Sequence, residues 1–156
     1  MKWLFKSAVM RRLINCWPPF FFSGIKIVKL DQDYRYCKVE LKSRPWTKNI
    51  NRSQYGGSMF SMTDPIYPLM LMGVLGNKYF VWDRQAEINF LQPGKGKLFA
   101  EFYLTEDRLQ QISQATAEGE KYFPQFRIDI KDDKGNVVCE VLRTLYVRKK
   151  SQYRPN

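Results

Sequence analysis

The chain has 156 residues, of which 44% are hydrophobic and 15% aromatic, a composition that suits one globular domain with a sizeable core and excludes a disordered chain. It contains no histidine, which excludes Ser-His and Cys-His nucleophile pairs and histidine metal clusters, and we expect neither a metal nor a cofactor. The formal net charge of +11 resides in the two terminal segments, because all 15 acidic residues lie between Asp31 and Glu140.

Residues 1–17 form a basic amphipathic pattern, in which apolar side chains recur near helical spacing with lysines and arginines between them. We predict a helix that packs on the domain, and a peripheral contact of this helix with a membrane surface is the alternative. Pro18 and Pro19 follow without a small-residue cleavage site, which argues against a signal peptide. No apolar run is long enough to span a bilayer.

Two strands joined by a hairpin are predicted next. Residues 24–30 and 34–41 alternate or are rich in β-branched and aromatic residues, and the polar residues 31–33 supply the turn between them. A polar loop over residues 42–54 then leads to the glycine pair of residues 56–57. The pair stands at the start of a long apolar stretch.

That apolar stretch, residues 59–75, carries Met, Leu, Ile and Phe almost all round, which is typical of a helix enclosed by protein. Asp64 is its one charge and the only acid within residues 41–82. We interpret Asp64 as a buried carboxylate without a local partner, kept for function or paired from elsewhere in the chain. The structural alternative makes Asp64 a helix N-cap before Pro65. Pro65 and Pro68 inside one continuous helix would kink it.

The rest of the sequence predicts antiparallel strands and one short helix. Strands are expected over residues 79–91, 97–104, 126–131 and 137–148, and the helix follows a cap at Thr105 and ends near residue 117. An enclosed helix followed by strands long enough to wrap it is the hot-dog architecture, an α+β fold. We predict a single hot-dog domain over residues 1–156, with an extra N-terminal helix over residues 1–17 and a basic tail over residues 150–156.

The segment around the glycine pair resembles the phenylacetyl-CoA thioesterase-like branch of the hot-dog thioesterase superfamily. That branch has an asparagine, a loop, His-Gly-Gly and an aspartate seven residues after the second glycine, and Gly57 and Asp64 keep this spacing. Residues 56–65, 81–83 and 87–93 look still closer to an uncharacterised bacterial hot-dog group. The resemblance covers about residues 17–149.

This resemblance implies an acyl-CoA thioesterase that hydrolyses an acyl thioester. The N–H of Gly57, at the start of a helix, would polarise the thioester carbonyl, and Asp64 would act as general base for water or as the nucleophile. Glycine suits the first role because a missing β-carbon lets a ligand approach the backbone. The substrate-binding candidates implied by the resemblance are Asn49, Asn51, Tyr55, Gly56 and Ser58, and for the phosphates of CoA Arg84, Arg148 and Lys149.

A composite site across a homodimer, or a dimer of dimers, is also expected. Seven helical residues rise about 10 Å, which is too far for Gly57 and Asp64 of one chain to serve the same carbonyl. We therefore infer that Gly57 of one subunit faces Asp64 of the partner subunit. The known dimers of the superfamily imply the same arrangement.

Two departures from the family pattern favour a second function. Tyr55 replaces the usual histidine and Arg52 stands where a glycine is common, so the alternative is a non-catalytic acyl-thioester-binding or regulatory hot-dog protein. A hot-dog dehydratase is disfavoured because that chemistry normally relies on histidine. The basic terminal segments contain no base-stacking motif, so binding to nucleic acid is not favoured. Three cysteines without metal-ligand spacing predict core thiols and a cytoplasmic protein.

Overall fold

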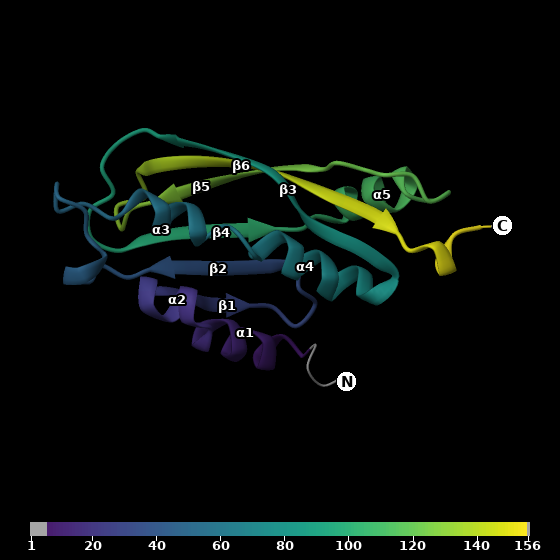
Figure 1. The fold of residues 1–156 in the computed structure, drawn as a ribbon, viewed down its shortest axis with the longest axis horizontal. Coiled ribbons are helices and arrows are strands. Elements are labelled where there is room, and N and C mark those ends of the chain that lie inside the picture. The colour runs from purple at the N-terminus through teal and green to yellow at the C-terminus, as the bar shows by residue number, and fades with distance from the viewer. Residues whose placement is uncertain (1–5, 156) are drawn as a thin grey trace.

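Six antiparallel strands form one sheet that wraps around helix α4 in the computed structural model, which describes residues 6–155 (Figure 1). The strands lie in the order β1-β2-β4-β5-β6-β3. Their bounds are β1 (Ile25–Leu30), β2 (Tyr36–Leu41), β3 (Tyr79–Phe90), β4 (Leu98–Tyr103), β5 (Gln125–Lys131) and β6 (Val137–Lys149). The helices are α1 (Ser7–Cys16), α2 (Pro18–Ser23), α3 (Gly56–Ser61), α4 (Ile66–Leu75) and α5 (Glu106–Ala115), with short 3-10 turns η1 (Pro45–Thr47), η2 (Gly76–Lys78) and η3 (Ser151–Tyr153). The predicted hot-dog fold with an extra N-terminal helix is confirmed.

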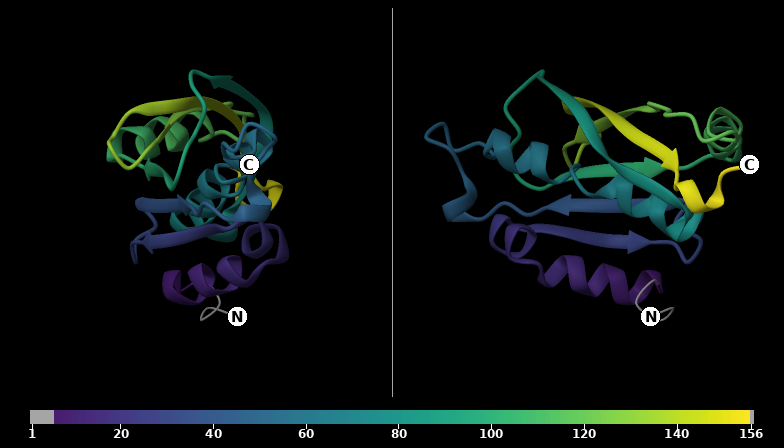
Figure 2. Two further views of the ribbon diagram at one scale, coloured as in Figure 1. Left: turned by 90° about the vertical axis from the view of Figure 1, so that its left-hand side faces the viewer. Right: turned by 45° about the vertical axis from the view of Figure 1, so that its right-hand side comes forward.

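Helix α1 lies along β1 and covers this edge of the sheet (Figure 2). Asn15 bonds both backbone groups of Ile27, because its Nδ2 donates to the carbonyl at 3.0 Å and its Oδ1 accepts from the N–H at 2.7 Å. Arg11 Nη1 donates to the carbonyl of Val28 at 3.0 Å. These side chains form hydrogen bonds with backbone groups of β1 that, on an edge strand, have no neighbouring strand to pair with. The predicted N-terminal helix therefore packs on the domain, and residues 1–5 of that prediction lie outside the described residues.

Residues 18–23 form the short helix α2, which the sequence pattern did not predict. Pro18 and Pro19 stand at its first two positions, where no N–H is needed for an intrahelical bond, and Gly24 ends it in the left-handed conformation with φ 77°. Phe20 is buried in the core, whereas Phe21 and Phe22 project to solvent. The proline pair thus starts a helix and places two phenylalanines on the surface.

The apolar stretch that was predicted as one helix is two helices, α3 and α4, joined by a turn over residues 62–65. Pro65 is the N-cap residue of α4, and Pro68 lies in its first turn, where a missing N–H forfeits no hydrogen bond. The expectation of one continuous helix is wrong, and the prolines kink no helix because the chain is interrupted before them. The first six residues of α4 are all buried, as an enclosed helix requires.

Strand β3 forms the other edge of the sheet, and within the described part of the chain only β6 pairs with it. Its register with β6 shifts between Asp83 and Gln85, so Arg84 is an extra residue that forms a bulge. The bulge leaves Asp83 partly buried and Arg84 exposed. A carboxylate on the edge strand is thereby directed toward the interior.

Candidate functional site

A buried arginine lies at the centre of the candidate site. On β6, every second residue from Cys139 to Val147 faces the core, and Arg143 is the one polar member of this row. Only 1% of Arg143 is exposed. A cation this deep in a protein requires partners for its charge and for its N–H groups, because its desolvation costs several kcal/mol on the order-of-magnitude scale for buried ions.

Arg143 finds those partners in the turn between α3 and α4. Its Nε donates to Thr63 Oγ1 at 3.0 Å, its Nη1 to Asp64 Oδ1 at 3.1 Å, and its Nη2 to the carbonyl of Phe60 at 3.1 Å. The Thr63 hydroxyl also donates to the Phe60 carbonyl, at 2.8 Å. Phe60 belongs to the last turn of α3, whose carbonyls lack helical partners, so the cation satisfies the end of that helix.

Asp64 is not buried, so the sequence-based expectation of a buried carboxylate is wrong, whereas the expected alternative of a partner from elsewhere in the chain is confirmed. Its side chain is 58% exposed, and it forms an ion pair with Arg143, which is 79 residues away in sequence. The helix-capping alternative fails as well, because the N-cap position of α4 is taken by Pro65 and has no side-chain hydrogen bond. Asp64 combines an exposed carboxylate with a fixed orientation, which is the arrangement that a general base or a nucleophile needs.

Asp83 is a second carboxylate on the same guanidinium. Its Oδ2 lies 3.3 Å from Arg143 Nη1, while its Oδ1 is buried and has no hydrogen-bond partner among the described residues. Burial raises the pKa of Asp83 to about 6; Arg143 opposes this shift and the charge of Asp64 adds to it. Asp83 lies in one of the segments that resemble the bacterial hot-dog group, but that resemblance implies no role for it.

We expect the Asp83→Asn variant to be more stable than the wild type at pH 8 and equally stable near pH 4. The carboxyl has a pKa of about 6 in the folded protein and 3.8 as a free group, so ionisation costs stability as the pH rises through this interval. The cost corresponds to about 3 kcal/mol at most. Urea unfolding of both proteins at several pH values measures it. A stability difference that does not change with pH would contradict this assignment.

The glycine pair begins α3, and aromatic rings occupy the space that its missing β-carbons leave. A β-carbon on Gly57 would stand 2.3 Å from Tyr55 Cε1, and one on Gly56 would stand 2.9 Å from Phe90 Cζ. The N–H groups of both glycines form no hydrogen bond within the described residues, whereas the N–H of Ser58 donates to the carbonyl of Tyr55 at 3.0 Å. Two free donors thus remain at this helix start, and Ser58 is not a third.

The two asparagines of the prediction lie in the loop before α3. Asn49 Oδ1 accepts hydrogen bonds from the N–H of Asn51 at 3.0 Å, the N–H of Ser53 at 3.1 Å and the hydroxyl of Ser53 at 3.0 Å. Asn49 is thereby engaged in holding its own loop. Asn51 is exposed beside it.

The three basic candidates lie on the outer surface near β3 and β6. Arg148 Nε donates to the carbonyl of Gly119 at 2.8 Å, and Lys149 Nζ donates to the carbonyl of Ala117 at 3.0 Å, so both tie the turn after α5 to β6. Arg84, on the bulge, places its guanidinium 4.2 Å from the centre of the Phe123 ring. Within the described residues, none of these three side chains contacts the glycine pair.

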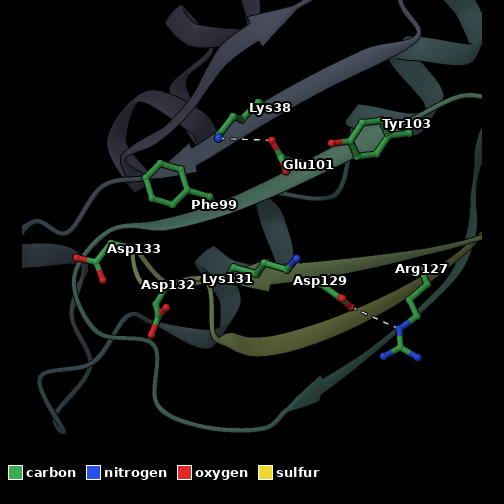
Figure 3. A pocket seen from close by; sticks show the side chains of 10 residues that line it. Lys38, Phe99, Glu101, Tyr103, Arg127, Asp129, Lys131, Asp132 and Asp133 are labelled. Carbon is green, nitrogen blue, oxygen red and sulfur yellow. Dashed lines mark hydrogen bonds and ion pairs between the residues drawn. The ribbon is translucent and has the colours of Figure 1, made fainter.

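A wide hollow lies elsewhere, on the outer face of the sheet over β2, β4 and β5 (Figure 3). Its volume is about 600 Å³. Four of the charged side chains that line it are paired with one another, Lys38 with Glu101 and Arg127 with Asp129, each at 3.4 Å. Arg143 and Asp64 are not among its lining residues, so this hollow is not part of the candidate site.

The thiols show no metal-ligating arrangement. Cys37 and Cys139 are buried, as predicted, and burial raises their thiol pKa values to about 12 and about 11 respectively. Cys16 is exposed, so its assignment to the core is wrong. Within residues 6–155 no group of three or more metal-ligating side chains comes together. Among the same residues, none of the helices has the length and apolarity needed to cross a bilayer.

Sequence reasoning missed the two residues that hold Asp64 in place, Arg143 and Thr63. A signal for Arg143 was present, because it interrupts an otherwise apolar row at every second position of the last predicted strand. An arginine at a core-facing strand position requires an acidic partner, and Asp64 was the acid without one.

Comparison with known proteins places the whole chain in one group. The family model described as Domain of unknown function (DUF4442) matches residues 2–147. A Pseudomonas aeruginosa protein of unknown function, named as a probable thioesterase, has a similar structure with a TM-score of 0.83, 19% identity and coverage of 92% of this chain and 95% of that one. No curated protein sequence matches significantly.

Two further solved structures share the architecture. A thioesterase from Haemophilus influenzae superposes with a TM-score of 0.68 and 16% identity over 96% of this chain and 94% of its own. The PaaI protein of Escherichia coli, from the phenylacetic acid degradation operon, gives a TM-score of 0.63 and 16% identity over 91% of each chain. At these identities the likeness establishes the hot-dog fold.

Proposed function

The chain belongs to the family called Domain of unknown function (DUF4442), and from its hot-dog fold and its Asp64–Arg143 site we propose that it is a hydrolase of acyl-CoA thioesters. The observation that carries the proposal is an exposed carboxylate held in one orientation by a buried guanidinium. Structures with the same fold that are named as thioesterases support the reaction class.

In the proposed reaction, Asp64 removes a proton from a water molecule as that water attacks the thioester carbon. A carbon–oxygen bond forms, the carbon–sulfur bond breaks, and CoA leaves as its thiol with the proton that water supplied. Arg143 touches neither water nor thioester in this scheme. Its role is to position the Asp64 carboxylate, which it holds through Nη1 while three other contacts fix the guanidinium itself.

The N–H groups of Gly56 and Gly57 supply the second part of the proposed site. Both are free to donate, and donors fixed at a helix start stabilise the negative charge that develops on the thioester oxygen. A groove of about 310 Å³ is lined by the residues that flank the glycine pair, Tyr55 and Ser58, together with Phe22, Ser23, Trp46, Thr47 and Lys48. Its three aromatic rings suit an acyl chain or the arm of the CoA.

A homodimer is part of the proposal, and its support comes from a free sheet edge rather than from the length of a helix. The estimate of about 10 Å assumed a continuous helix from Gly57 to Asp64. Helix α3 ends at Ser61, so the separation of Gly57 and Asp64 is not the rise of one continuous helix. The support comes from β3, a long edge strand with a free side, which carries Asp83 and lies beside Asp64. Pairing of two such edges would cover the exposed Asp64 and bring the partner's Gly57 toward it.

One observation favours the second candidate function, a non-catalytic acyl-thioester-binding protein. The ring of Tyr55 lies against Gly57, where the carbonyl of a substrate would approach. Tyr55 is 59% exposed, and catalysis requires that this ring swing aside. Binding of a non-hydrolysable acyl-CoA thioether without release of free CoA from any acyl-CoA thioester would support this alternative and contradict hydrolysis.

A subunit-mixing experiment tests the composite site. We expect Gly57→Ala and Asp64→Asn to be inactive alone, and their equimolar mixture, after unfolding and refolding together, to recover about a quarter of the wild-type CoA release. The reason is that half of the dimers pair one variant with the other, and each such dimer keeps one intact site. Tyr103→Ser mixed with Asp64→Asn serves as the control for refolding. No recovery in the first mixture would place both residues in a single-chain site.

A further inference from the structure

Large apolar side chains gather at one end of the molecule, around α2, η1 and the loop before α3, which lie together on the left in Figure 1 and in the right-hand view of Figure 2. Phe22 is 66% exposed, Trp46 69% and Ile50 97%. The full set, called the aromatic end from here on, is Trp17, Phe21, Phe22, Trp46, Ile50 and Tyr55. Single exposed apolar residues are ordinary, but a cluster of this size marks an interaction surface.

Contacts connect four members of the aromatic end, Phe21, Phe22, Trp46 and Tyr55. Arg44 links two of its members, because its Nη1 donates to the carbonyl of Phe21 at 3.4 Å and its guanidinium lies 5.4 Å from the centre of the Trp46 ring. Phe22, Trp46 and Tyr55 line one groove together. The rings therefore form a patch on the surface.

The tip of the loop is built to present an isoleucine. Three hydrogen bonds to Asn49 Oδ1 and one from the N–H of Arg52 to the carbonyl of Asn49, at 2.9 Å, close the turn. Arg52 accepts a left-handed conformation with φ 58°, which costs a non-glycine residue on the order of 1 kcal/mol. This fixed turn holds Ile50 in solvent, where its side chain adds nothing to the folded core.

The two chain segments that carry the aromatic end contain charges of one sign. Residues 6–30 contain five lysines and arginines, residues 42–63 contain four, and neither segment contains an acid. The acid that precedes the second segment in sequence, Glu40, is paired with Lys97 at 3.7 Å. Aromatic and aliphatic side chains framed by lysine and arginine are the pattern that binds the interface of an anionic membrane.

We propose that the aromatic end docks this protein on a membrane of anionic phospholipids, with Ile50, Trp46 and Phe22 entering the interface and the surrounding lysines and arginines facing the lipid headgroups. A second copy of the chain does not fit this surface, since it would bring the same positive side chains, Lys42, Arg44, Lys48 and Arg52, to the contact. The proposed dimer would form along the free edge of β3, and β3 carries none of the residues of the aromatic end. Phe22 and Trp46 also line the groove of the proposed substrate site, and vesicle binding is measured without any acyl thioester.

Vesicle flotation tests the proposal. We expect the protein to bind vesicles of phosphatidylcholine and phosphatidylglycerol, to bind pure phosphatidylcholine weakly, and to lose binding as salt rises to about 0.5 M. Ile50→Asp and the double variant Lys48→Glu, Arg52→Glu are each expected to weaken binding by a factor of about ten or more. The side chains of Ile50, Lys48 and Arg52 are exposed, so these variants keep the fold.

Tyr103→Ser is the matched control, because Tyr103 is 55% exposed on the outer face of β4, away from the aromatic end. It is expected to bind vesicles as the wild type does. Equal binding of Ile50→Asp and the wild type, or no binding of the wild type to anionic vesicles at low salt, would overturn the proposal. A change of oligomeric state in Ile50→Asp, measured by sedimentation, would assign the surface to a second copy of the chain and overturn it as well.

Discussion

Replacing Asp64 with asparagine is expected to lower kcat for acyl-CoA hydrolysis by a factor of about 100 to 10,000 while the folded structure persists. The amide keeps the size of the side chain and loses the basic oxygen that would take a proton from water. Stability is expected to fall by about 1 kcal/mol or less, because Asp64 is 58% exposed and the buried Arg143 keeps Asp83 as a partner. Release of free CoA across a panel of acyl chain lengths, beside urea unfolding, measures both quantities.

A carboxylate in a similar pairing elsewhere provides the control. Asp129 pairs with Arg127 on the outer face of the sheet, and Asp129→Asn is expected to hydrolyse at the wild-type rate. Matched rates for Asp64→Asn and the wild type would remove Asp64 from the mechanism. A loss of activity in Asp83→Asn but not in Asp64→Asn would transfer the role of base to the other carboxylate on Arg143.

Replacing Arg143 with methionine is expected to destabilise the folded protein by about 3 to 5 kcal/mol. Methionine fills much of the same volume, but it leaves the carbonyl of Phe60 and the partly buried carboxylate of Asp83 without their cation. The turn between α3 and α4 would also lose its attachment to β6. The midpoint of urea unfolding, measured with the slope of the transition, gives this cost.

The same substitution at a surface arginine isolates the effect of burial. Arg127 forms two ion pairs, with Asp129 and Glu140, but its side chain is 65% exposed, so Arg127→Met is expected to cost about 1 kcal/mol or less. Adding Asp83→Asn to Arg143→Met is expected to restore part of the lost stability, because the carboxylate that was left unpaired becomes neutral. If Arg143→Met and Arg127→Met lowered the free energy of unfolding equally, the buried contacts of Arg143 would not stabilise the site.

Much of the fold was predictable because its signals are local. Period-two alternation gave the strands over residues 126–131 and 137–148, and Thr105 caps α5 by accepting a hydrogen bond from the N–H of Arg108, as its position predicted. The apolar pattern alone predicted one helix and missed the break between α3 and α4, although Pro65 pointed to a helix start near that position. The surroundings of residues 62–65 decided this, with Arg143 bonded to the turn.

The candidate site divides in the same way. Gly57 and Asp64 were identified by a family resemblance that rests on their spacing, a property of eight consecutive residues. Asn49 was identified by position too, yet its carboxamide oxygen holds its own loop. Arg143 and Asp83 join Asp64 only because β6 and β3 pair beside α4 in the folded chain.

The sequence by itself determined the hot-dog fold, the enclosed helix and the glycine pair before it, because hydrophobic period and turn residues act over short stretches of chain. Only the tertiary structure decided the state of the one acid in that stretch. Asp64 lies on the surface and is paired with a cation 79 residues away. The physical reason is that the energy of a charge depends on its distance from other charges and from water, and both distances are set by how remote segments pack.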